Sequence, residues 1–433
     1  MTERTPGRRT VLAGLGAVVA GCGGQATETA RDEPTDGTTD DTTDAGTGAA
    51  GTTAGSGETT ANPADISLPE GAAWPSFGGT SGNRGSMDTG RGPSAPAGVA
   101  WRTDVDGTYT MPGPAVADGM AFVGSGTKAY AFDARTGETA WTAELEVLTH
   151  HFSPTVADGA VVFAAQPSGT IQPGSQGRLA RFAFDGREAW RRTLPVTTDP
   201  TLADGRIVVG ESATDGGAVR AVDPADGTDL WRTTLDASGV RGAPAVVDGL
   251  AVVTAVRDET GLLAGLDPAS GSVRFTVSLP TGARAAPVVA DGTVFVQRND
   301  GVLAAFGLDG SRKWRVNAGK RAGSAPVVVG DRVVAFVENT LVGIDRSGET
   351  AWTADIGTTL INGVTVAGDT AYVGGSRLSA VSVADGSVVW DVPIPGEAGA
   401  FGAPVVVGNT AFVGVCIKRE AGDLYDDYMY AFV

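Results

Sequence analysis

Cysteine, histidine and lysine are all scarce in this sequence. Two cysteines in 433 residues form at most one bridge, which excludes a disulfide-stabilised scaffold. Because the chain has only two histidines as well, we also exclude a zinc site built from several Cys and His ligands. Only four lysines are present and the net charge is −18, which excludes nucleic-acid binding through bulk positive charge. Hydrophobic residues still make up 42% of the chain, enough for a sizeable core.

The first 22 residues are typical of an export signal. Arg8 and Arg9 precede an apolar stretch, Val11–Ala20, that is too short to span a hydrocarbon layer of about 30 Å. Paired arginines before such a run resemble a twin-arginine signal. The following Val19-Ala20-Gly21-Cys22 resembles a lipobox, which predicts a lipid on Cys22 and leaves Cys416 as the free thiol. An uncleaved N-terminal anchor or a chance similarity is the alternative.

Two further segments precede the repeats. Residues 23–70 consist largely of Thr, Asp, Gly, Ala and Glu, so they cannot bury enough apolar surface to offset the entropy of ordering. We expect them to form a disordered linker, and we expect residues 71–95 to form a lead-in to the folded domain. The acidity of the chain with few lysines resembles haloarchaeal proteins, in which carboxylates hold water in strong brine.

A repeat with a period of 38–49 residues fills the rest of the chain. Each full unit reads Ala-Pro-Val-Val-x-Asp-Gly, then a short β-branched run, then Ala-x-Asp-x-x-x-Gly-x-x-x-Trp. The units begin at Pro114, Pro154, Pro200, Pro244, Pro287, Pro326, Val364 and Pro404. The large aromatic residue that ends a unit recurs at Trp101, Trp141, Trp190, Trp231, Phe275, Trp314, Trp352 and Trp390. Chance does not account for seven of eight tryptophans at one repeat position.

The repeat predicts an all-β fold. Each unit contains four short runs of strand-forming residues with tight turns and no period of 3.6, which favours sheets over βαβ units. Four-stranded antiparallel sheets repeated about every 40–45 residues are the signature of a β-propeller. The eighth unit stops at Val433 after three strands and lacks its fourth. The strand around Trp101 is a fourth strand without the three that should precede it. We therefore predict eight blades over residues 96–433, the last closed by the strand of Trp101. Seven blades plus an unpaired strand is the alternative.

The repeated aromatic residue is expected to dock between blades. A flat ring can lie against a glycine turn of the neighbouring blade, where no Cβ intrudes. This pattern resembles the tryptophan-docking repeats of the PQQ-repeat, or quinoprotein-like, propeller family, and the resemblance covers about residues 96–433. The segment from Trp74 to Gly85 is similar to the lead-in of that family, and we expect it against the propeller surface.

The resemblance implies two functional classes. Quinoprotein dehydrogenases hold pyrroloquinoline quinone (PQQ) in the central funnel with a tryptophan floor, a calcium ion, an Asp base and a disulfide between adjacent cysteines. Here the two cysteines are 394 positions apart, and every tryptophan after Trp74 belongs to the repeat. We therefore predict no cofactor, no metal and no catalytic residue, and a binding or assembly scaffold of the BamB-like, non-catalytic branch. A PQQ-dependent alcohol or sugar dehydrogenase with Ca²⁺ is the alternative.

Four basic residues form the candidate ligand site. Arg241, Arg284 and His151 each lie three residues before the proline of their unit, and Arg321 lies five before its own. They enter the innermost strands from one side, so we expect them at one mouth of the channel. There they would form a cationic patch for an anionic ligand or an acidic peptide. Arginines paired with loop carboxylates are the alternative.

Two other features are weaker signals. The pair His150-His151 has no accompanying carboxylate pattern, and we expect it in a loop. Residues Glu420–Asp427 offer oxygen ligands but not the spacing of a calcium loop, so we expect a solvated turn. The whole chain is expected to be a monomer on the extracytoplasmic face of the cell membrane. We expect it to contact the membrane through the lipid alone. We expect its partner to be a protein or an anionic ligand, and we expect no binding of nucleic acid.

Overall fold

The computed structural model describes an all-β protein. It covers residues 61–88, 90–95, 97–107, 111–147, 152–167, 172–321, 324–357, 363–395, 398–400, 402–418 and 425–433. These ranges contain 34 strands and one short 3₁₀ helix, η1 (Pro63–Asp65). No helix within them is long and apolar enough to cross a membrane.

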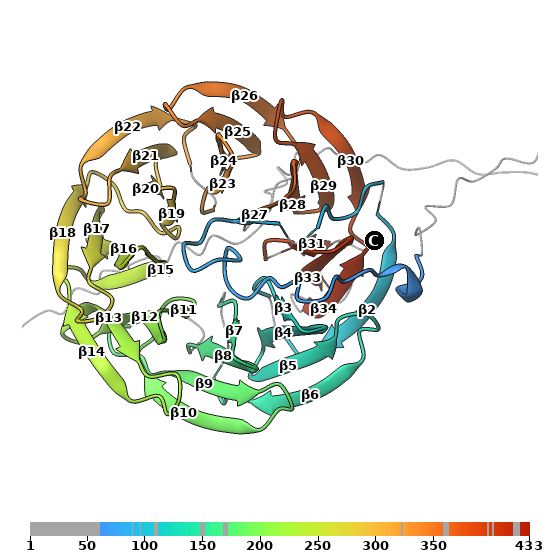
Figure 1. Cartoon of the computed structure of the whole chain (residues 1–433), viewed down its shortest axis with the longest axis horizontal. Coiled ribbons are helices and arrows are strands. Elements are labelled where there is room, and N and C mark those ends of the chain that lie inside the picture. The colour runs from blue at the N-terminus through green and yellow to red at the C-terminus, as the bar shows by residue number, and fades with distance from the viewer. Residues whose placement is uncertain are drawn as a thin grey trace, which may run out of the picture. The chain divides into compact units, whose positions relative to one another are not determined.

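The strands form eight sheets arranged in a ring (Figure 1). We number them blades 1 to 8 in chain order, and within blades 1 to 7 the four repeat strands run antiparallel from the inside outward. Blade 1 is β3 (Ala115–Ala117), β4 (Met120–Ser125), β5 (Lys128–Asp133) and β6 (Thr139–Glu144); blade 2 is β7 (Thr155–Ala157), β8 (Ala160–Ala165), β9 (Gly177–Ala183) and β10 (Glu188–Leu194). Blade 3 is β11 (Thr201–Ala203), β12 (Arg206–Ala213), β13 (Gly216–Val222) and β14 (Asp229–Thr234); blade 4 is β15 (Gly239–Val247), β16 (Leu250–Arg257), β17 (Thr260–Leu266) and β18 (Val273–Leu279).

The second half of the ring repeats this order. Blade 5 is β19 (Val288–Ala290), β20 (Thr293–Gln297), β21 (Val302–Phe306) and β22 (Arg312–Asn317); blade 6 is β23 (Val327–Val329), β24 (Arg332–Val337), β25 (Thr340–Asp345) and β26 (Thr350–Asp355). Blade 7 is β27 (Val364–Ala367), β28 (Thr370–Gly374), β29 (Arg377–Ser382) and β30 (Val388–Pro393), to which β1 (Ser86–Met87) adds in parallel. Blade 8 is β31 (Ala398–Ala400), β32 (Val405–Val407), β33 (Thr410–Lys418), β34 (Tyr425–Phe432) and β2 (Val99–Val105).

The burial of each strand follows its place in the blade. Middle strands are covered on both faces by the neighbouring blades, and all six residues of β8 are buried. Outer strands are covered on one face only, so exposed and half-buried residues alternate along most of β6. Between β3 and β4, Asp118 and Gly119 both have positive φ, 49° and 75°, as a tight two-residue hairpin turn requires.

The ring is closed by the two ends of the propeller. Strand β2 pairs antiparallel with β34, with Val99 opposite Phe432 and Trp101 opposite Ala431. Gly98 and Val433 exchange two backbone hydrogen bonds of 3.0 Å. The prediction of eight blades closed by the strand of Trp101 is confirmed, and the alternative of seven blades is wrong.

The aromatic residues of the repeat lie against glycines of the next blade. A Cβ added to seven of these glycines would lie 2.5–2.8 Å from the ring; the pairs are Gly137–Trp101, Gly186–Trp141, Gly227–Trp190, Gly271–Trp231, Gly310–Phe275, Gly348–Trp314 and Gly386–Trp352. Six of the indole N–H groups donate at 2.7–3.2 Å to backbone carbonyls of Ala134, Phe184, Pro224, Pro268, Arg346 and Val383. Trp390 is buried with Tyr372 and Phe432 where blade 7 meets blade 8.

Candidate ligand site in the plugged channel

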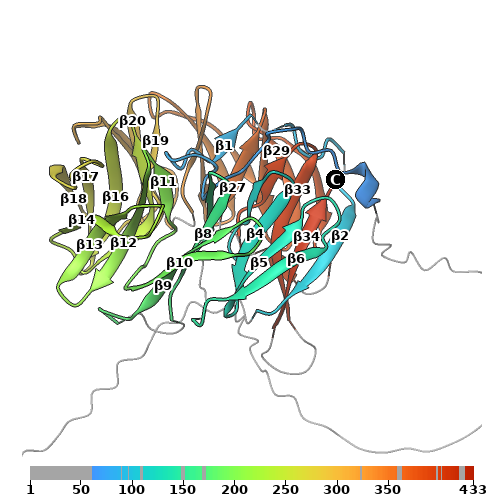
Figure 2. The same ribbon diagram turned by 60° about the horizontal axis from the view of Figure 1, so that its bottom comes forward.

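The lead-in segment lies inside the ring. We call residues 74–88 and 90–92 the plug; they cross the centre of the ring in Figure 1, and Figure 2 shows β1 beside β27. The sequence led us to expect this segment against the propeller surface, whereas the structure places it along the innermost strands. The inner edge of each blade carries unpaired backbone groups, and the plug supplies partners for them.

The plug bonds to the same position of six blades. The backbone N–H of the penultimate residue of an inner strand donates to a plug carbonyl at 2.6–2.9 Å; the pairs are Val116–Trp74, Val156–Pro75, Val246–Ser81, Val289–Gly82, Val328–Arg84 and Val366–Gly85. In blade 8 the plug reaches Gly408, whose carbonyl accepts from Gly92 N at 3.0 Å. The plug therefore closes the channel on the side of the Asp-Gly turns.

A cavity of about 490 Å³ remains between the plug and the opposite mouth. The plug contributes Trp74, Phe77 and Asn83, and the segments entering the inner strands contribute Pro114, Arg284 and Pro326 among others. The lining is mostly apolar. Cavities of about 300–1,000 Å³ with a few placed polar groups are typical of small-molecule sites.

Asn83 borders this cavity and holds the plug to blades 4 and 5. Its side chain is 1% exposed, and Nδ2 donates to the carbonyls of Ala243 (2.8 Å) and Pro287 (3.1 Å). Because both neighbours are acceptors, only the NH₂ group can face them, which fixes the orientation of the amide. Oδ1 is then left buried and without a partner. With less than 1 Å² of accessible surface, this oxygen is out of reach of a molecule in the cavity.

Asp199 is a polar residue that the sequence analysis missed. It precedes Pro200, at a position where the other blades have Gly, Ser or Ala, and that substitution was the available signal. Its carboxylate is 6% exposed and accepts a hydrogen bond from Ser153 N at 2.5 Å, and Ser153 lines the cavity. Burial raises the pKa of Asp199 to about 7, so this carboxyl titrates near neutrality.

The structure brings two of the four candidate basic residues together. Arg241, in β15, is half-buried and its Nε has no partner; burial, and then the charge of Arg284, lower its pKa. Arg284 is exposed at the mouth and lines the cavity. Arg321 is exposed and does not line the cavity, and His151 lies outside the described residues.

Two candidates remain, His150 and the acidic segment 420–427. His150 and residues 420–424 lie outside the described residues. Asp427 lies in β34, where it is buried and accepts a hydrogen bond from Ser125 Oγ at 3.2 Å, so the expected solvated turn is wrong at this residue. No group of three His, Cys, Asp or Glu side chains in the described ranges could hold a metal ion. The two cysteines of the sequence are not adjacent, so the adjacent-cysteine disulfide of quinoproteins has no counterpart, and Trp74 borders the cavity. We derive no redox step.

Comparison with known proteins gives one family and several relatives. A family model described as outer membrane protein assembly factor BamB matches residues 94–213, 215–346 and 337–416. The chain is 26% identical over 228 residues to outer membrane protein assembly factor BamB of Yersinia pestis, covering 46% of this chain and 55% of the relative. It is 28% identical over 202 residues to that of Moranella endobia, covering 44% and 50%. The matched parts span about half of these relatives.

Solved structures share the fold at low identity. BamB from Moraxella catarrhalis superimposes with a TM-score of 0.58 at 13% identity, covering 77% of this chain and 99% of that one. Quinohemoprotein alcohol dehydrogenase from Comamonas testosteroni gives 0.64 at 14% identity, covering 87% and 83%. At such identities the superpositions show the fold alone.

Proposed function

Because the chain belongs to the family described as outer membrane protein assembly factor BamB, we propose that it is a non-catalytic protein-binding scaffold of the cell envelope. The names of its relatives connect such propellers with protein assembly. Since the match spans about half of each relative, we carry over the scaffold role and not their particular clients.

The contacts that join the blades at the centre, the seam and the junctions carry this proposal. The plug joins six inner strands, and β2 closes the seam. At seven of the blade junctions an aromatic ring packs against a glycine of the next blade. A framework held at its centre, seam and junctions presents its loops in fixed positions, which reduces the entropy lost on binding a protein.

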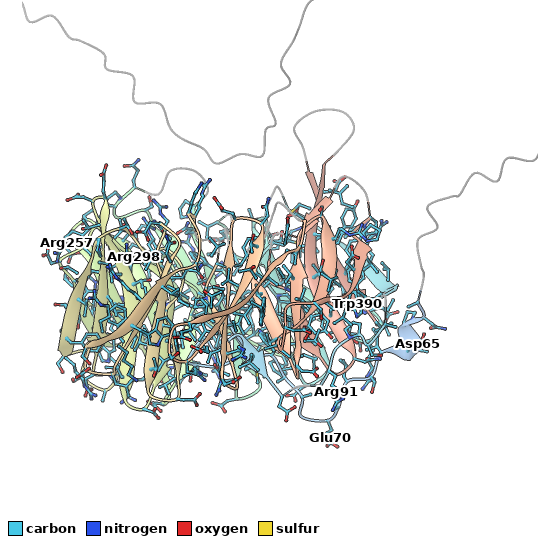
Figure 3. The ribbon with its side chains drawn as sticks, turned by 90° about the horizontal axis from the view of Figure 1, so that it is seen from above. Asp65, Glu70, Arg91, Arg257, Arg298 and Trp390 are labelled. Atoms are coloured by element: carbon cyan, nitrogen blue, oxygen red, sulfur yellow. The ribbon has the colours of Figure 1, made fainter. Side chains whose placement is uncertain are left out.

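The open mouth is the face we assign to the partner. On the plug side the inner strands end in two-residue turns such as Asp118-Gly119, whereas the mouth carries longer connections such as residues 280–287. Figure 3 shows Arg257 and Arg298 towards one side of the ring, and Glu70 and Arg91, which precede the repeat strands, towards the other. Longer loops on a fixed framework are where binding specificity is placed.

Site-specific photo-crosslinking in envelope membranes tests this assignment. A photoreactive residue at Arg321, on the open mouth, is expected to give a discrete crosslink to an envelope protein. The matched position is Asp158, in the exposed turn on the plug side, where no such product is expected. A discrete product from Asp158 alone would reverse the assignment, and none from either position would contradict the scaffold role.

Reconstitution tests the dehydrogenase alternative separately. The purified chain is incubated with PQQ and Ca²⁺ and assayed for dye-linked oxidation of alcohols and sugars. We expect neither turnover nor retention of the quinone absorbance on gel filtration. Quinone-dependent turnover would replace the scaffold proposal by the enzyme.

We also propose that Cys22 carries the lipid that holds the scaffold on the extracytoplasmic face. Wild-type protein is expected in the detergent phase of a Triton X-114 extraction, and the variant Cys22→Ala in the aqueous phase. Cys416 does not confuse a parallel thiol assay, because it is 1% exposed and burial raises the pKa of its thiol. Maleimide labelling of the native wild-type protein would show that Cys22 is free and contradict lipidation.

A further inference from the structure

Arg241 and Arg284 are neighbours because two chain segments approach closely. Gly242, next to Arg241, has a φ of +68°, and a Cβ there would lie 2.5 Å from the backbone of Ala286. The Thr254 hydroxyl lies 2.8 Å from the carbonyl of Arg241 and 3.1 Å from that of Ala285. The entries of blades 4 and 5 are therefore held together, each with a guanidinium at the same place of its repeat.

This pair of cations has no carboxylate partner in the described part of the chain. Twelve other arginines there form ion pairs: Arg84, Arg178, Arg191, Arg192, Arg220, Arg232, Arg257, Arg274, Arg298, Arg332, Arg346 and Arg377. Two like charges, one of them half-buried with Nε covered and unbonded, repel each other and leave a desolvation cost uncompensated. An anion at this point would offset both effects.

The cavity beneath the arginines limits what that anion can be. Arg284 lines it, and its walls include Trp74, Phe77 and Pro326, which an inorganic ion would leave uncovered. The complement of these features is an apolar body with one negative group.

We propose that the plugged channel binds a small amphipathic carboxylate, whose carboxylate bonds to Arg284 and whose apolar body fills the cavity. Arg241 acts as a positioning residue that adds charge beside Arg284. The proposal does not rest on the scaffold role, because it concerns the interior of the channel and the scaffold role concerns its outer loops.

Calorimetric titration of the full mature chain with indole-3-acetate tests the site. This probe has a carboxylate, an aromatic body and one N–H. Arg284→Ala is expected to weaken binding about tenfold or more, since hydrogen bonds to charged groups are the strong ones. Arg241→Ala is expected to weaken it less, and Arg284→Lys to retain part of it. The matched control is Arg257→Ala, an arginine near the same face that is paired with Asp236, and it should bind as the wild type does.

A change in the probe tests the charge without disturbing the fold. Indole-3-acetamide, which lacks the charge, is expected to bind about tenfold more weakly. Equal binding of the acetate and the acetamide, or no effect of Arg284→Ala, would overturn the proposal, as would the absence of any binding at millimolar probe.

Discussion

The blade junctions depend on single glycines that lie under an aromatic ring. Gly271 has a φ of +72°, and its missing Cβ leaves the space that Trp231 occupies, at 2.6 Å. The indole N–H of Trp231 also donates to the carbonyl of Pro268 at 2.8 Å. One residue without a side chain thus allows both the ring contact and the hydrogen bond that join blades 3 and 4.

Alanine at two glycines separates the ring contact from backbone strain. Gly119 has a φ of +75°, close to that of Gly271, but an added Cβ there meets nothing within 4 Å. We expect Gly119→Ala to lower the free energy of unfolding by about 1 kcal/mol, the cost of a left-handed alanine. Gly271→Ala should cost about 1–3 kcal/mol more, because Trp231 must move. Urea unfolding measures both, and equal losses would show that the ring does not depend on the glycine.

The buried carboxyl of Asp199 makes stability depend on pH. Its folded pKa of about 7 lies above the ordinary value of 3.8, so the folded protein binds the extra proton between these values. The stabilising contribution is therefore full below about pH 4 and is lost as the pH rises to 7, at up to about 1.4 kcal/mol per pH unit. Asp199→Asn keeps an oxygen for Ser153 N and removes the titration.

Unfolding free energies at pH 5, 6, 7 and 8 test this prediction. The wild type is expected to lose stability relative to Asp199→Asn between pH 5 and 7, and the difference should then level off. Asp158→Asn, in an exposed turn of blade 2, is the matched control and should run parallel to the wild type. Parallel curves for all three proteins would show that Asp199 is ionised throughout.

At the scale of elements, the plug and the closing strand β2 protect different strand edges. The plug supplies carbonyls to inner edges that water could also reach, whereas β2 covers the long edge of β34 from Asp427 to Phe432. Unpaired strand edges promote aggregation. Removing residues up to 92 should therefore lower the melting temperature but leave a monomeric ring.

Removing residues up to 106 is the matched truncation, because it takes β2 as well. We expect this protein to aggregate or to pair its β34 edge with another copy. Circular dichroism and size-exclusion chromatography distinguish the two outcomes. A monomer of unchanged melting temperature from the longer truncation would contradict the closing role of β2.

The elements that sequence reasoning predicted are those with local signals. The short strand-forming runs, the Asp-Gly turns and the recurring tryptophan all act within one blade or between neighbouring blades, so they predicted the strands, the eight blades and the closure. The path of the plug could not be predicted, because its contacts join residues such as Asn83 and Ala243, which are 160 positions apart. The cavity follows from that path. The proximity of Arg241 and Arg284 was partly accessible, since both hold the same repeat position.

At the scale of the whole molecule, the net charge of −18 sets the response to salt. Four aspartates in the turns on the plug side, Asp118, Asp158, Asp204 and Asp248, have φ near 50° and no ion pair within the described ranges. Their repulsion acts over about 10 Å at 0.1 M salt and about 3 Å at 1 M. We expect the free energy of unfolding to rise between 0.1 and 2 M KCl.

A variant with asparagine at these four positions tests the cause of that rise. Asparagine tolerates the left-handed backbone of the turns, so the fold is kept while the net charge goes from −18 to −14. The variant should be more stable than the wild type at 0.1 M KCl and should gain less from added salt, because less repulsion remains to be screened. If both proteins gain equal stability from salt, the salt strengthens the burial of apolar surface rather than screening these four aspartates. The charge of the molecule would then serve solubility alone.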